Sequence, residues 1–187
     1  MSKKVIRFSL DANDIDKAIR EIEKYKVEFQ RKVDTYRQRI AEEIKKTASL
    51  NFGSAVMDDV VGTIVGKQLV PGGSPHKPKV TVSVAENGGI SVVVADGEDA
   101  VWCEFGAGVY HNGSVGSSPN PYGYDLGFTI GSYGFGHGRQ QVWGYYIDPK
   151  DKTKVVLTRG TPASMPMYNA TQEVMKKAIA IAREVFG

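Results

Sequence analysis

The most informative segment of this chain is VWCEFGAG, residues 101–108, in which an aromatic–acidic–aromatic step precedes two glycines. Glycine adopts positive φ values and allows close backbone approach, so Gly106 and Gly108 let the chain turn sharply. We expect the rings of Trp102 and Phe105 to be buried just before this turn. No convincing nucleophile stands beside a base here, so the segment is predicted to be a structural corner formed by Trp102, Glu104, Phe105, Gly106 and Gly108. On this interpretation, Glu104→Gln leaves folding nearly intact.

A second distinctive block, GTPASMPMY, spans residues 160–168 and leads into a helix that ends at Phe186. We expect Ser164 to cap this helix, and Pro166 suits its first turn because proline is favoured there. Apolar side chains recur at helical spacing and predict a buried stripe. Its members are Ala170, Val174, Ala178, Ile181 and Val185.

Together the two blocks resemble the neck or tail-completion proteins of tailed bacteriophages, which are small head-to-tail connector proteins. The resemblance follows the order of elements along the whole chain, but its sharp motifs are confined to residues 102–108 and 160–170. Family members commonly carry Thr where Ala107 stands and a bulky aromatic where Met167 stands. These departures leave room for a relative with a different position in the particle.

The resemblance implies a structural virion protein that forms a homo-oligomeric ring, joins head to tail and lets DNA pass. It implies no enzymatic activity and no cofactor. The implied partners are further copies of the chain, a head-closure or adaptor protein, a tail terminator or tail tube protein, and passing genomic DNA bound without sequence specificity. The implied location is the neck or tail of the virion, assembled in the host bacterial cytoplasm.

Two alternatives stay open at this point. The first is a tail terminator that caps the tail tube. The second, from another class, is a small cytoplasmic hydrolase that uses Cys103 or Glu104. A thiol such as Cys103 beside His111 is a possible nucleophile, but Cys103 lies in a segment expected to pack on the core, where a thiol acts as a small apolar group. Glu104 and Asp99 form a conceivable carboxylate pair, yet no nearby element encloses a substrate.

Length and composition favour a single domain over residues 1–187. Cys103 is the only cysteine, which excludes an intrachain disulfide and a cysteine-built zinc site. No run of about eighteen apolar residues is available to span a bilayer, so no membrane contact is expected. The basic start of the chain lacks a signal-peptide core, which favours the cytoplasm. The segment Gly62–Gln68 lacks the spacing and hydroxyl of a phosphate-binding loop, so no cofactor is predicted.

The charge is unevenly distributed along the chain. Residues 1–52 carry thirteen basic and nine acidic side chains, residues 53–148 four and nine, and residues 149–187 seven and three. This pattern indicates either ordinary surface variation or complementary faces between identical neighbours. In a ring, acidic side chains facing the channel repel the DNA backbone, and the candidate lining residues are Glu98, Asp99 and Asp125.

The N-terminal third has the three- and four-residue apolar spacing of a helix. Its apolar positions are Ile15, Ile19, Ile22, Phe29, Val33, Tyr36, Ile40, Ile44 and Ala48. A continuous helix over residues 14–50 is about 55 Å long, which exceeds a compact domain of this size. The helix therefore either breaks, which we predict near Tyr25–Val27, or projects. The heptad-like spacing is also typical of a coiled coil, but packing on the chain's own sheet is favoured.

The remaining pattern predicts an α+β fold. Period-2 alternation and turn signals indicate strands at residues 5–10, 60–65, 80–84, 90–95, 141–147 and 154–157. Asn87-Gly88 marks a hairpin turn, and residues 70–78 are expected to be a loop. We expect a mainly antiparallel sheet with the long N-terminal helix and the C-terminal helix on one face.

Residues 106–141 form a long Gly/Tyr-rich loop insertion with ten glycines and few charges. A loop of this length is uncommon in a compact domain and is usually functional or disordered. Aromatic side chains act as anchors at interfaces. We therefore predict an oligomer or partner interface, ordered only against a neighbour, that uses Tyr110, Tyr122, Tyr124, Phe128, Tyr133 and Phe135.

Overall fold

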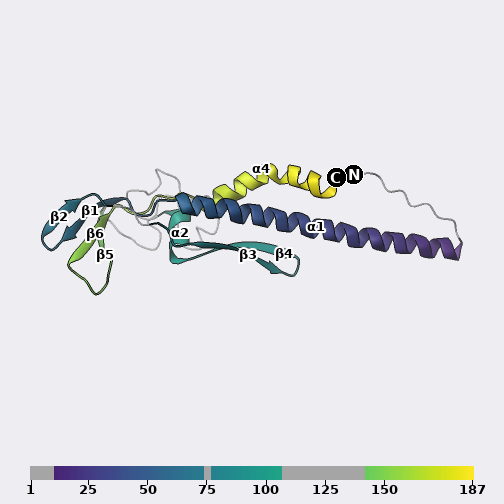
Figure 1. Cartoon of the computed structure of the whole chain (residues 1–187), viewed down its shortest axis with the longest axis horizontal. Helices are drawn as coiled ribbons and strands as arrows, with labels where there is room; N and C mark the ends of the chain where they lie inside the picture. Colours follow the sequence, from purple (N-terminus) through teal and green to yellow (C-terminus); the bar gives the residue numbers. More distant parts are fainter. Residues whose placement is uncertain (1–10, 74–76, 107–141) are drawn as a thin grey trace.

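The computed structural model describes residues 11–73, 77–106 and 142–187. The elements are α1 (Ala12–Ser54), β1 (Val60–Val65), β2 (Gln68–Pro71), β3 (Thr81–Asn87), β4 (Ile90–Asp96), α2 (Glu98–Phe105), β5 (Trp143–Tyr146), β6 (Lys154–Thr158) and α4 (Pro166–Phe186). The molecule is elongated, with one group of strands at one end and α1 extending towards the other (Figure 1). The expected α+β class is confirmed.

Helix α1 is continuous over 43 residues, which corresponds to a length of about 65 Å. The predicted break near Tyr25–Val27 is therefore wrong. No glycine or proline occurs between Ala12 and Phe52, and Lys26 interrupts the apolar stripe without disturbing the backbone, because lysine is a good helix former. The helix projects instead, and its N-terminal part extends past α4 and the β3–β4 hairpin (Figure 1).

Helix α4 packs along the C-terminal half of α1. At the far end of α4, the ring of Phe186 lies 5.9 Å from that of Phe29 and 6.0 Å from that of Tyr36, measured between centroids. An ion pair joins Arg39 to Glu184 at 2.6 Å near the same end. The end of α4 therefore marks the boundary between the packed half of α1 and its projecting half.

The hairpin of β3 and β4 packs on another side of α1. Its strands pair antiparallel from Thr81–Asp96 to Asn87–Ile90, and its tight turn uses Gly88 and Gly89 with φ of 55° and 88°, so the predicted hairpin is confirmed. Arg37 of α1 forms a 2.9 Å ion pair with Glu86 of β3. This contact fixes the hairpin beside α1.

The strands form two sheets instead of the single sheet that we expected. One has the order β2-β1-β6-β5 and the other is β3-β4 alone. The hairpin buries Val82 in the core formed with the helices, so this face of the hairpin is covered by helices although the sheet has only two strands. Strand β2 lies within and just before the segment expected to be a loop. It ends at Pro71, as an edge strand can, because an edge position tolerates the missing N–H of proline.

The main hydrophobic core lies where the end of α1, the hairpin, α2 and the start of α4 meet. Its buried members are Ala48, Phe52, Ala55, Met57, Val82, Ala100, Cys103 and Ala170. No helix of the described residues is long and apolar enough to cross a membrane. Within the same ranges, His, Cys, Asp and Glu side chains form no group that could hold a metal ion. The predicted strand at residues 5–10 lies outside the described residues.

Candidate functional site

The first sequence block forms the end of a short helix. Helix α2 ends at Phe105, and Gly106 follows as its C-cap. The φ of 75° at Gly106 and the hydrogen bond from its N–H to Trp102 O at 2.8 Å give the expected sharp turn. A Cβ atom at Gly106 would lie 3.0 Å from Ala163 N and from Thr161 O. Glycine is therefore required here for two reasons, namely the positive φ and the close approach of the second sequence block.

The burial expected of this segment is observed for its aromatic residues. Phe105 is buried, and Trp102 is half-buried against the main core. What sequence reasoning missed is that these residues belong to a helix. The helix has only eight residues, with four apolar residues in succession from Ala100 to Cys103, and this is too short a pattern to show a helical period.

Glu104 connects the two sequence blocks directly. Its side chain is buried, with 5% of its surface exposed. Oε2 accepts a hydrogen bond from Met167 N at 2.9 Å, and Oε1 accepts one from Tyr168 N at 3.1 Å. These amides lie in the first turn of α4, directly after Pro166, where backbone N–H groups have no partner within the helix. A carboxylate at a helix N-terminus is also favoured by the helix dipole.

The expectation that Ser164 caps α4 is wrong. Met165 occupies the N-cap position with φ of 51°, and its side chain forms no capping hydrogen bond with the helix. Ser164 instead donates to Cys103 O from both its N–H, at 2.9 Å, and its hydroxyl, at 3.2 Å. The segment before α4 is thus fixed to the end of α2, and the capping role passes to Glu104.

This geometry predicts a larger effect of Glu104→Gln than the small one expected from the sequence. A glutamine side chain has one acceptor oxygen and one NH2 group. It can therefore accept from only one of the two N–H groups of Met167 and Tyr168, while its NH2 group faces the other donor. The substitution also removes the charge that interacts with the helix dipole.

Cys103 does not have the properties of a nucleophile. Its side chain is fully buried, and its sulfur lies 3.2 Å from that of Met57. Burial, with smaller contributions from Asp99 and Glu104, raises the pKa of the thiol to about 12. Because the reactive species is the thiolate, this cysteine is inert near neutral pH and serves as a small core residue. His111, considered as its partner, lies outside the described residues.

The acidic candidates for a channel lining separate into different environments. Glu98 is exposed in the first turn of α2. Asp99 accepts a hydrogen bond from Lys79 N at 2.8 Å, which ties the start of α2 to the segment before β3. Asp125 lies outside the described residues. The channel lining therefore stays a prediction.

The predicted interface aromatics and Gly108 also lie outside the described residues, and their role stays a prediction. The aromatics are Tyr110, Tyr122, Tyr124, Phe128, Tyr133 and Phe135.

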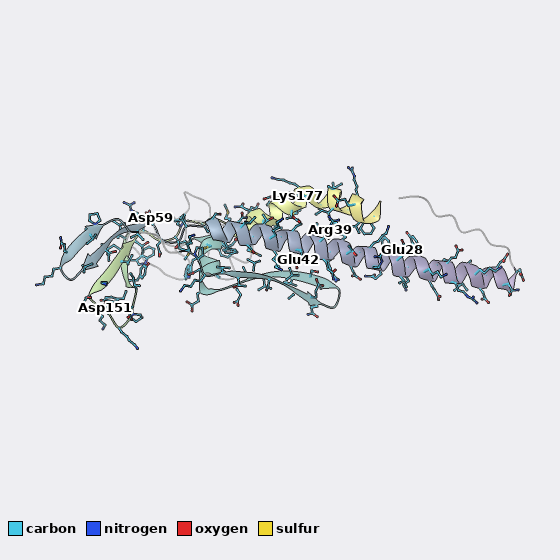
Figure 2. All side chains as sticks on the ribbon, in the orientation of Figure 1. Glu28, Arg39, Glu42, Asp59, Asp151 and Lys177 are labelled. Atoms are coloured by element: carbon cyan, nitrogen blue, oxygen red, sulfur yellow. The ribbon has the colours of Figure 1, made fainter. Side chains whose placement is uncertain are left out.

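Hydrogen bonds in two further places, at the start of α4 and at the base of the four-stranded sheet, were not predicted from the sequence. Asn51 of α1 donates to Pro166 O at 3.1 Å, which fixes the start of α4 to the end of α1. On the side of the four-stranded sheet, Asp59 N donates to Gly160 O at 2.6 Å, and Arg159 N donates to Asp59 O at 2.9 Å. Figure 2 labels Asp59 where this sheet joins the rest of the molecule. Such contacts join residues far apart in sequence, so no local pattern reveals them.

These contacts connect the end of α1, α2, the segment before α4 and the base of the four-stranded sheet at one junction. Its polar groups hold backbone in place, and its thiol is buried. Comparison with protein-family models, with curated proteins and with solved structures gives no match for this chain.

Proposed function

We propose that this chain is a structural subunit of the neck of a tailed bacteriophage or a phage-derived particle. In this role, copies of the chain form a ring that joins the DNA-filled head to the tail and lets DNA pass. The ring contacts a head-closure or adaptor protein on one side and a tail terminator or tail tube protein on the other. The observation that carries the proposal is the direct bonding of Glu104 to the first turn of α4.

This contact supports the proposal because it joins the two sequence blocks that bear the resemblance. The acidic residue of the first block holds the helix that follows the second block, and Gly106 allows their close approach. The residues that bear the resemblance are thus in contact with one another in the fold. A similarity spread over unrelated positions would give no such single contact.

The exposed surface adds a second line of support. Apolar side chains that are exposed in one copy can be covered by contacts with neighbouring molecules. Large apolar side chains are exposed on α1, β2, β4 and α4, among them Ile22, Leu69, Val70, Ile90, Val92, Met175 and Ile179. An elongated molecule with exposed apolar residues on several of its helices and strands is suited to contacts with several neighbours.

The two alternatives fare differently. A hydrolase that uses Cys103 or Glu104 is disfavoured, because both side chains are buried and the carboxylate of Glu104 is occupied by backbone amides. A tail terminator shares the ring architecture, and the geometry of one subunit does not separate it from a neck protein. The position in the particle separates them.

The decisive genetic test removes the gene from the phage or prophage that encodes this chain. We expect DNA-filled heads and separate tails of normal length that do not join. Tails of uncontrolled length would instead identify a tail terminator, and normal particles would contradict both. Complementation with Glu104→Ala should fail, whereas complementation with Glu98→Ala, which alters an exposed glutamate of the same helix, should restore joined particles.

A further inference from the structure

The projecting half of α1, residues 12–28, carries an apolar stripe that continues past the end of α4. The side chains of Ile15, Ile19, Ile22, Tyr25 and the boundary residue Phe29 are between 37% and 54% exposed. Residues seven apart lie on nearly the same side of a helix. The stripe is therefore continuous with the α1 surface that packs against Phe186. Figure 2 labels Glu28 just past the end of α4, where this projecting half begins.

An open apolar groove lies on the packed half of the same helix. It has a volume of about 470 Å³, and its walls come from α1, α4 and β4. Tyr36 and Ile40 line it from α1, Val174 and Met175 from α4, and Val93 from β4. Met175 is 64% exposed. The groove is therefore an apolar surface that the chain's own helices and hairpin leave partly open.

The projecting half and the groove match in length and in charge. The stripe from Ile15 to Phe29 is about 21 Å long, and the α1 part of the groove from Val33 to Ile44 is about 17 Å long. Residues 12–28 carry five acidic and four basic side chains, whereas residues 29–54, which include the α1 wall of the groove, carry three acidic and six basic ones. These two segments of α1 thus have net charges of opposite sign.

We propose that the projecting half of α1 docks in the groove of a second copy of this chain. The two surfaces come from different parts of the molecule, so each copy offers its projecting half to one neighbour and its groove to another. Contacts of this head-to-tail kind close into rings when the rotation between copies permits. The inference rests on the proposed function for the ring, and it assigns the contact that builds it.

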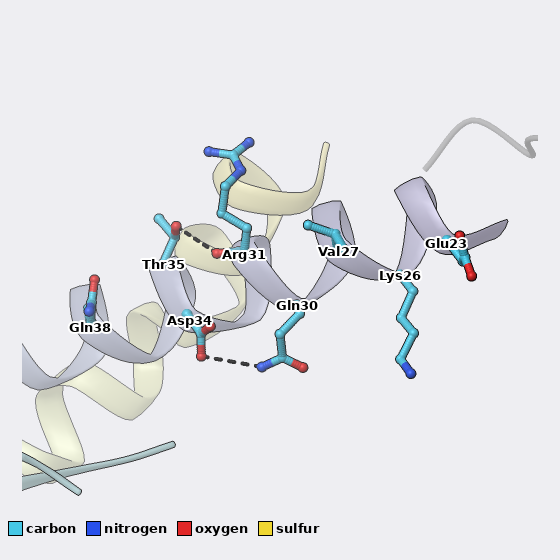
Figure 3. Close-up of a pocket in the computed structure, with 8 residues that line it drawn as sticks. All are labelled: Glu23, Lys26, Val27, Gln30, Arg31, Asp34, Thr35 and Gln38. Atoms are coloured by element: carbon cyan, nitrogen blue, oxygen red, sulfur yellow. Dashed lines mark hydrogen bonds between the residues drawn. The ribbon is translucent and has the colours of Figure 1, made fainter. Parts of the chain in front are cut away.

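Association of the full-length protein tests this contact. Sedimentation velocity over a concentration series should show assemblies larger than two copies. Ile22→Asp should weaken association at least tenfold, because it places a charge on the buried side of the contact. Val27→Asp is the matched control. Val27 is 70% exposed and lies roughly 140° around the helix from Ile22, in a separate hollow lined by Gln30 and Asp34 (Figure 3). The control Val27→Asp should leave association unchanged.

A mixing experiment tests the two halves of the contact separately. Ile22→Asp damages the projecting half and Met175→Asp damages the groove, so neither variant should associate alone. An equal mixture keeps one intact projecting half and one intact groove, and it should form pairs that grow no further. Circular dichroism of each variant checks that the fold is retained, as expected for substitutions at exposed positions.

Cross-linking gives a direct proximity test. A protein with Ile22→Cys mixed with one carrying Met175→Cys should form a disulfide-linked pair, whereas Val27→Cys in place of Ile22→Cys should not. The native Cys103 is buried and does not compete. A wild-type protein that stays monomeric at all concentrations, or an assembly that ignores Ile22→Asp or stops at two copies, would overturn the inference. If the chain is nevertheless found at the neck of particles, the proposed function stands without this contact.

Discussion

Glu104 and Met167 are 63 residues apart in the sequence, yet Glu104 Oε2 accepts a 2.9 Å hydrogen bond from Met167 N. Helix α4 has no cap from its own N-cap side chain, and the carboxylate of a second helix supplies it. The same contact aligns α2 with α4 at the point where α1 also bonds Pro166 through Asn51. One acidic residue therefore holds the start of α4, a helix that forms one wall of the proposed groove.

Replacing Glu104 should be costly for stability. We expect Glu104→Gln to lower the free energy of unfolding by about 1–3 kcal/mol, the usual cost of leaving a buried hydrogen-bond donor without a partner. Glu104→Ala should cost at least as much. The exposed Glu98 of the same helix is the control, and Glu98→Gln should stay within about 0.5 kcal/mol of the wild type. Urea unfolding measures all three, and equal stability of Glu104→Gln and wild type would remove the capping role.

Two glycines should respond in opposite directions to the same substitution. Gly106→Ala forces a side chain into a φ of 75° and against the backbone of Thr161 and Ala163, so we expect a loss of about 1–3 kcal/mol. Gly53 lies inside α1, and a Cβ atom added to it would have no neighbour within 4 Å. Gly53→Ala should therefore be neutral or stabilise by up to about 1 kcal/mol, because alanine is the better helix former. Thermal and urea unfolding should order the two variants accordingly.

Stability should fall at alkaline pH. Burial raises the pKa of Cys103 to about 12, and burial with a hydrogen bond to Asp58 raises that of Tyr145 to about 12. In the unfolded chain these groups lose their protons at lower pH than in the folded chain, from about pH 9 for the thiol and pH 10 for the phenol. The unfolded state then binds fewer protons than the folded state, so the free energy of unfolding decreases between pH 9 and 12.

Two variants separate the sources of this pH dependence. Cys103→Ala should reduce the loss of stability above pH 9, and Tyr145→Phe should reduce it above pH 10. Native Cys103 should also resist alkylation at pH 8 and react once the protein is unfolded in urea. An unchanged pH dependence in both variants, or rapid alkylation of the native thiol, would contradict the burial of these two side chains.

The protein should bind double-stranded DNA weakly. If Glu98, Asp99 and Asp125 line a channel, they repel the phosphate backbone and keep the passing genome from adhering. We expect a dissociation constant weaker than about 1 µM at physiological salt, measured by fluorescence anisotropy with a labelled duplex. Tighter binding with a steep dependence on salt would favour a DNA contact by basic side chains, such as those of residues 29–54 of α1.

The fold class was accessible from the sequence because its main elements have strong local signals. The apolar period of α1 and α4 and the Gly88-Gly89 hairpin are patterns of neighbouring residues. The separation into two sheets was not accessible, because strand pairing depends on contacts such as Val60 with Thr158 between distant segments. The break predicted in α1 was wrong because the absence of glycine and proline is a stronger signal than the interruption of the apolar stripe at Lys26.

The candidate site was accessible only in part. The segment around Gly106 was identified as a turn because glycine carries a local conformational meaning. The role of Glu104 was missed, because this carboxylate caps a helix that begins far along the sequence. No local pattern at Glu104 or at the start of α4 indicates such a contact. Ser164 shows the converse, since a residue type that suits an N-cap bonds the end of α2 instead.

Labelling the chain in intact particles tests the central claim most directly. A gold-labelled antibody against the protein, applied to purified particles and imaged by electron microscopy, reports where the chain lies. The account predicts label at the junction between head and tail. Label confined to the distal tail end or the head shell, or protein found only free of particles, would contradict it.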